Sequence, residues 1–181
     1  MKATKFIVLI CGAVGVAAFF FPLVHVKEMG NDAKASAWQF IKGIEKVKEV
    51  VKEGDSTIQA SDLKDDAKGE IKVHAEGVKE GANVATGIII GVFVPAGLLL
   101  LMGAFGAMGT FGRGKAAFTF IFGLLGVGVW VLLKMASDQI SKDSGAADVL
   151  GTAHTMLAVS YFGGTLGGLI ALIKPEQKPA A

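Results

Sequence analysis

Three histidines are the side chains of this sequence with the widest range of possible chemistry. His25 and His154 each lie at the end of a long apolar run, and we expect both near the same face of a membrane. Two opposed histidines can hold a haem iron, so a membrane redox protein with histidine-ligated haem is one alternative. A hydrogen-bonding role at the membrane interface is the simpler interpretation. His74 continues an apolar stripe and is expected to pack there.

Other reactive groups are scarce. Cys11 is the only cysteine, so the chain can form neither an intramolecular disulfide nor a cysteine-based zinc site. The apolar runs contain no acidic or basic residue, so a membrane-embedded proton relay or ion-coupling site lacks its groups. No phosphate loop, nucleophile elbow or nucleic-acid patch is present. We therefore predict no enzyme, no catalytic residue, no cofactor or metal site, and no nucleic-acid partner.

Four apolar runs would position these side chains, at residues 6–24, 81–112, 116–133 and 149–173. Roughly 20 apolar residues in a helix cross the core of a bilayer. The sequence thus predicts an all-α integral membrane protein, a four-helix bundle. The expected transmembrane helices are 1–25, 84–108, 116–135 and 149–173, with a turn at 109–115 and a tail at 174–181.

The charges predict an orientation in the cell (cytoplasmic or inner) membrane. The turn carries Arg113 and Lys115, and the N-terminal segment carries Lys2 and Lys5. In contrast, the segment 26–83 holds ten lysines against twelve acidic residues. Basic residues are enriched in cytoplasmic loops, so we expect both termini in the cytoplasm. The segments 26–83 and 136–148 would then lie on the outer side.

The segment 26–83 has a helical pattern. Apolar residues recur at steps of three and four while Lys and Glu occupy the other faces, which is typical of amphipathic helices. A turn at 54–57 would separate two such helices, and nothing stops the second strongly before the membrane. We therefore expect an extracytoplasmic helical hairpin. The stripes are Ala37, Ile41, Ile44, Val47 and Val51, then Leu63, Ala67, Ile71, His74 and Val78.

Three interpretations of these stripes stay open. The two helices could pack on each other as a small cap, or part of their surface could dock a partner protein. They could also lie on the outer leaflet, although a mixed Lys/Glu face suits that less well than a lysine-rich one. The candidate partner-docking residues are Trp38, Phe40, Ile41 and Ile44.

Small residues four apart recur in the apolar runs. Helices in lipid associate largely through close packing, and glycines let two backbones approach. Packing within the bundle explains most of the pattern, and contact with another copy or a partner is the alternative. Pro95 is expected to kink the second span. The predicted helix-packing residues are Gly87, Gly91, Gly163, Gly164, Gly167 and Gly168.

The sequence has residues suited to helix packing and few reactive groups. This favours a non-enzymatic membrane protein, a structural, assembly or accessory subunit of a larger membrane complex. The hairpin would be its docking surface. The expected partners are the lipid bilayer and other membrane proteins or further copies of the chain. A small oligomeric channel or transporter is the main alternative, suggested by Pro95 and by hydroxyls in the fourth span, namely Thr152, Thr155, Ser160 and Thr165.

The four-span layout with a large first outer loop is similar to that of claudins and tetraspanins. Both families rely on cysteines in the large loop, and this loop has none. Claudins also fold that loop as strands, whereas helices are expected here. The resemblance therefore implies no family and no residue role.

The predicted orientation can be tested by cysteine labelling. Ser56→Cys and Ser144→Cys should react with a membrane-impermeant thiol reagent in intact cells. Thr110→Cys should react only after the membrane is permeabilised. Labelling of Thr110→Cys from outside would reverse the assigned orientation.

Overall fold

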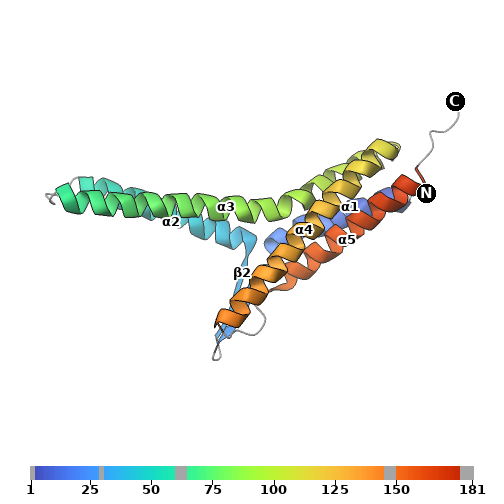
Figure 1. Cartoon of the computed structure of the whole chain (residues 1–181). Helices are drawn as coiled ribbons and strands as arrows, with labels where there is room; N and C mark the ends of the chain where they lie inside the picture. The colour runs from blue at the N-terminus through green and yellow to red at the C-terminus, as the bar shows by residue number, and fades with distance from the viewer. Residues whose placement is uncertain (1–2, 29–30, 60–64, 145–149, 176–181) are drawn as a thin grey trace. The chain divides into compact units, whose positions relative to one another are not determined.

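The computed structural model describes residues 3–28, 31–59, 65–144 and 150–175. These residues form five α-helices, a short 3-10 helix and a two-stranded sheet (Figure 1). They divide into two compact units, Met1–Ala37 with Gly91–Ala181, and Trp38–Ile90. In chain order the elements are α1 (Ala3–Ala17), η1 (Ala18–Phe20), β1 (Pro22–Glu28), β2 (Asn31–Ser36), α2 (Ala37–Gln59), α3 (Asp65–Ala107), α4 (Arg113–Ser144) and α5 (Thr152–Ile173).

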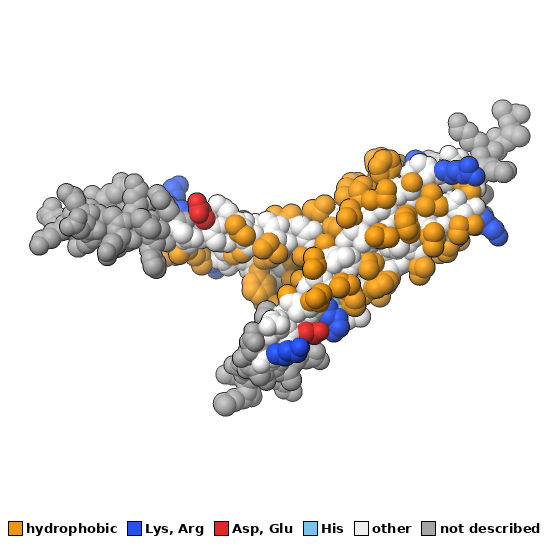
Figure 2. Space-filling model, viewed as in Figure 1, with side chains coloured by type: hydrophobic (Ala, Val, Ile, Leu, Met, Phe, Trp, Pro, Cys, Tyr) orange, Lys and Arg blue, Asp and Glu red, His pale blue; other side chains and the backbone are white. Residues whose placement is uncertain are grey.

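Four of the helices are long and apolar enough to cross a membrane, which confirms the prediction of a mostly helical chain with four helices of spanning length. The shortest candidate span has 18 residues, and at 1.5 Å per residue it is about 27 Å long, close to a hydrocarbon core of about 30 Å. Apolar side chains cover the visible surface of these helices (Figure 2). Large exposed apolar surfaces of this kind are typical of contact with lipid. The candidate spans are Ala3–Phe20, Gly77–Ala107, Arg113–Gln139 and Thr152–Ile173.

Helix α5 lies between α1 and α4 and contacts both through glycines. Towards α1, Gly163 lies against Cys11 and Gly167 against Val8. Residue numbers rise along one helix as they fall along the other, so α1 and α5 are antiparallel. Towards α4 the same holds: Gly126 faces Tyr161, and a Cβ added at Gly123 would lie 2.6 Å from the Thr165 backbone nitrogen. Glycine therefore sets the spacing on both sides of α5.

The part of α3 that belongs to the first unit also contacts its neighbours at glycines. Gly12 of α1 lies against the Leu100 backbone, and a Cβ at Gly103 would lie 2.5 Å from the Cα atom of Leu9. Helices α1 and α3 are therefore antiparallel. A Cβ at Gly164 of α5 would lie 2.6 Å from a methyl carbon of Leu99. The ends of α3 and α5 thus share one end of the unit with the starts of α1 and α4.

The strand pair β1–β2 departs from the sequence-based expectation. A transmembrane helix was predicted over 1–25 and a purely helical hairpin over 26–83, but β1 and β2 pair antiparallel from Pro22↔Ser36 to Glu28↔Asn31. Pro22 lacks a backbone donor and cannot continue a helix, and alternating valines follow it. The nitrogen of Gly151 donates to the Leu23 oxygen at 2.9 Å, so β1 is also tied to the start of α5.

Two helix boundaries also differ from the prediction. The predicted turn at 54–57 is wrong, because α2 continues through Gly54 to Gln59. Helix α4 extends to Ser144, so most of the predicted loop 136–148 is helical. The remainder of that loop, at 145–148, lies outside the described residues, as does 176–181 of the predicted tail. Helix α3 is continuous from Asp65 to Ala107 and runs through Pro95.

The glycine contacts predict unequal tolerance of α5 to larger side chains. A Cβ at Gly168 would lie 2.5 Å from the backbone nitrogen of Phe120, which cannot rotate away, whereas Gly163 meets only the side chain of Cys11. We expect Gly164→Leu with Gly168→Leu to lower the free energy of unfolding in detergent by about 1–3 kcal/mol or more. The pair Gly163→Leu with Gly167→Leu should cost less.

Gly128→Leu in α4 is the matched control, because a Cβ there would meet no atom within 4 Å. It should leave the thermal midpoint unchanged or raise it, since leucine is the better helix former. If the Gly164/Gly168 variant has the same thermal midpoint as this control, close packing at α5 does not hold the bundle together.

Candidate functional sites at the Tyr161 junction and the face of α2

Tyr161 is the largest fully buried side chain among the described residues, with no exposed surface. Its ring occupies the space beside Gly126 of α4, where a Cβ would lie 2.5 Å from the ring carbon Cγ. Its hydroxyl donates a hydrogen bond to the backbone oxygen of Val92 in α3. One side chain thus joins three helices.

The acceptor of this bond lies one turn before Pro95. Proline has no backbone N–H, so the carbonyl of Gly91 loses its helical donor, and the proline ring presses on the preceding turn. In a membrane such disturbed backbone groups are satisfied by neighbouring helices. The Tyr161 hydroxyl donates to the next carbonyl along the chain, that of Val92, and so adds a bond from α5 within the disturbed turn. The expected kink at Pro95 stays a prediction.

Sequence reasoning identified Pro95 but missed Tyr161. The available signal was that this is the only tyrosine of the chain and that it stands inside an apolar run. A phenol placed there needs a hydrogen-bond partner, because burying an unpaired hydroxyl is costly.

Of the six predicted packing glycines, four lie against another helix. Gly163, Gly164, Gly167 and Gly168 all have close neighbours on α1, α3 or α4. A Cβ at Gly87 or Gly91 would meet no described atom within 4 Å, so these two do not mediate contacts within the described chain. The buried part of α3 begins at Val92, and its close contacts are made instead by Gly103 and Gly106.

His154 is packed in the first turn of α5 rather than presented to solvent, with 9% of its surface exposed. Its ring stacks on Trp130 of α4 at 4.9 Å between centroids, and the Trp130 indole donates to the His154 backbone oxygen at 3.2 Å. The Nε2 atom is enclosed and has no hydrogen-bond partner among the described groups. His25 lies on β1, opposite Lys34. An enclosed Nε2 does not favour the haem alternative, because an axial ligand needs space for the macrocycle. The side chain of His74 is not among those that the structure describes.

The four docking candidates lie on two sides of α2. Ile41 and Ile44 are half-buried, on the side from which Lys48 donates to the Asn83 side chain of α3 at 2.7 Å. Phe40 is 38% exposed. Trp38 is 44% exposed, and the ammonium of Lys42 lies 5.0 Å from the centre of its ring. The first pair therefore belongs to the contact with α3, and Phe40 belongs to an outer face.

That outer face is an apolar stripe, which the sequence pattern alone did not distinguish from the other apolar positions of α2. Phe40, Gly43, Val47 and Val50 follow each other at steps of three and four and so lie along one side of the helix. Val47 is 47% and Val50 is 67% exposed, and a Cβ at Gly43 would meet nothing within 4 Å. We call these four residues the α2 stripe. The sequence pattern grouped Val47 with Ile41 and Ile44, and its exposure places it here.

The bond between Tyr161 and Val92 predicts a coupling with Pro95. Tyr161→Phe keeps the ring but removes the donor, and should lower the free energy of unfolding by about 0.5–1.5 kcal/mol. In a Pro95→Ala background the loss should be smaller, because alanine restores a regular turn around Val92, and that turn then depends less on a bond from α5. A double-mutant cycle in detergent measures the difference. Equal losses of unfolding free energy in both backgrounds would show that the Tyr161 hydrogen bond is not coupled to Pro95.

Comparison with protein families, with characterised proteins and with solved structures finds no match to this chain. The residues and their geometry are therefore the basis for a functional proposal.

Proposed function

We propose that the chain is a non-enzymatic accessory or structural subunit of a larger membrane complex. In this proposal the four apolar helices anchor it in the cell membrane. The helix pair of α2 and the first part of α3 forms an extracytoplasmic hairpin that docks another membrane protein. The observation that carries the proposal is the α2 stripe, an exposed apolar row on an otherwise charged helix.

The composition of α2 supports a protein partner over a lipid surface. Its polar faces alternate Lys and Glu, as in Lys42, Glu45, Lys46 and Glu49. A helix that lies on a membrane usually carries a basic polar face. An apolar stripe flanked by charges of both signs is instead typical of helices that pack on other helices. The expected occupant is thus an amphipathic helix of a partner protein.

The positions of the charges support the proposed orientation. Arg113, Lys115 and Lys5 lie at the end of the first unit where α3 stops, and Lys5 and Lys115 donate to backbone oxygens there. With basic residues on the cytoplasmic side, both termini face the cytoplasm. The segment 26–83 and the end of α4 then lie outside.

The two alternatives have less support. For a channel, the described helix junctions would have to open, and they are closed by backbone contacts at Gly123, Gly103 and Gly168. The Ser160 hydroxyl is enclosed beside Gly15 and Ala96 instead of lining an open path. A redox role would need His154 to leave its stack on Trp130. Ion flux in vesicles and the visible spectrum of the purified protein test these alternatives directly.

Site-specific photo-crosslinking tests the docking surface. A photoreactive amino acid at Val47, on the α2 stripe, should give a defined crosslinked product with another protein in native membranes. The same group at Glu49 serves as the control, because Glu49 is exposed on a different side of α2. Equal product from the two positions, or none from Val47, would contradict docking through the stripe.

A further inference from the structure

Two lysine ammonium groups are held at the C-terminal end of α3. Lys5 of α1 donates to the Gly109 backbone oxygen at 3.1 Å, and Lys115 of α4 donates to the Phe105 backbone oxygen at 3.0 Å. Carbonyls at the end of a helix lack helical donors and carry the negative end of its dipole. They therefore hold both ammonium groups at one place, although the like charges repel each other.

The link that follows α3 is held by packing. Phe111 is only 3% exposed and forms a buried cluster with Val8, Ala116 and Ala171. The ring of Phe111 also lies against Gly106, where a Cβ would come within 2.9 Å of its Cε2 atom. With Phe111 anchored, the backbone of Arg113 and Lys115 at the start of α4 has a fixed position.

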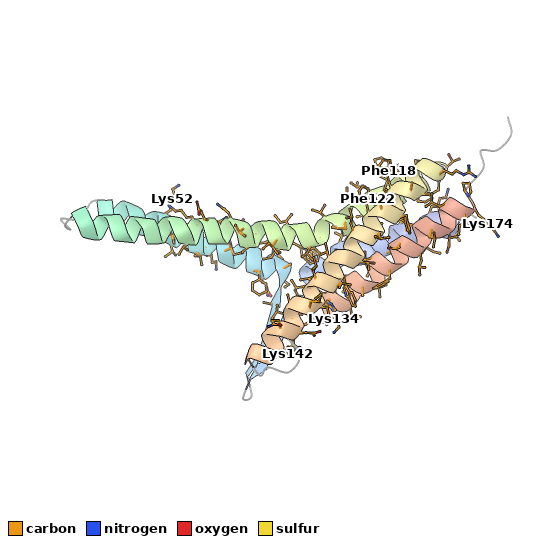
Figure 3. All side chains as sticks on the ribbon, viewed as in Figure 1. Lys52, Phe118, Phe122, Lys134, Lys142 and Lys174 are labelled. Atoms are coloured by element: carbon orange, nitrogen blue, oxygen red, sulfur yellow. The ribbon has the colours of Figure 1, made fainter. Side chains whose placement is uncertain are left out.

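Basic residues are in excess at this end of the unit. Lys5, Arg113, Lys115 and Lys174 all belong to it, whereas the sequence contains no Asp or Glu over 81–137 or 149–175. Figure 3 shows Lys174 at the end of the helices opposite to Lys134 and Lys142. At that opposite end Lys134 lies 3.7 Å from Asp138, so the charge there is mixed. Within the described part of the chain, the two ends thus differ in net charge, not merely in the number of lysines.

We propose that the end formed by Lys5, Arg113, Lys115 and Lys174, the basic end, binds the phosphate of an anionic phospholipid headgroup. A lysine has three donors, so Lys115 retains donors for a phosphate oxygen beside its bond to Phe105, and an arginine can bind phosphate with two parallel hydrogen bonds. Basic clusters at the end of membrane helices attract anionic lipids in this way. The proposal does not depend on a partner protein at the α2 stripe.

Native mass spectrometry of the purified full chain tests this with phosphatidylglycerol and phosphatidylcholine as probes. The wild-type chain should retain phosphatidylglycerol preferentially. Arg113→Gln with Lys174→Gln should reduce that preference by about five-fold for each residue changed. Both side chains are exposed, so this variant should keep the fold, which its thermal midpoint in neutral detergent will verify. The matched control is Lys134→Gln with Lys142→Gln, which removes the same number of charges from the opposite end.

An unchanged lipid preference in the Arg113/Lys174 variant would overturn the proposal, as would an equal loss in the control. A further arm adds inorganic phosphate at millimolar concentration to the lipid-bound protein at constant ionic strength. Retention of phosphatidylglycerol supports a lipid headgroup site. Displacement by phosphate would assign the basic end to the free ion and overturn the assignment to lipid.

Discussion

Helices surrounded by lipid gain little from burying apolar side chains against one another, because the lipid tails are equally apolar. Their association depends on how closely their backbones can approach. In this protein α4 and α5 meet this constraint reciprocally: Gly123 faces the Thr165 backbone, and Gly168 faces the Phe120 backbone. Neither position could hold a Cβ at the present spacing. The same constraint explains why residues of low helix propensity recur in a helix that is nevertheless well packed.

Close approach of the backbones also lets one phenol reach a neighbouring helix. Because Gly126 leaves room for its ring, Tyr161 can lie between α4 and α3 and donate to Val92. That bond lies next to the place where Pro95 removes a backbone donor from α3. The glycine contacts and the proline are therefore parts of one arrangement, since a wider helix spacing would leave the disturbed turn of α3 without this donor.

The sequence was informative where long-range periodicity and the bilayer both constrain the chain. Four charge-free runs of the right length predicted four apolar helices, and glycines four apart in α5 indicated its contacts. The points where helix, strand and turn preferences of nearby residues compete were harder to predict. Helix α1 ends at Ala17 and the strand β1 begins at Pro22, because proline cannot continue a helix and the valines that follow it prefer extended backbone. Gly54 did not stop α2, because a single glycine weakens a helix by only about 1 kcal/mol. Gly87 shares its spacing with the packing glycines, and spacing alone does not say whether a neighbour is present.

Anchoring and recognition are separate in the proposed function: glycine contacts hold the apolar helices, and we propose that the exposed α2 stripe recognises a partner. The most direct test is the mass and composition of the particle extracted from native membranes without detergent. The chain has a mass of 18.7 kDa, and we expect it in a larger particle that contains a defined second protein. Val47→Asn with Val50→Asn should release that protein, while Glu45→Gln with Glu49→Gln should retain it. A particle that contains this chain alone, or one that is unchanged by the valine substitutions, would contradict the account.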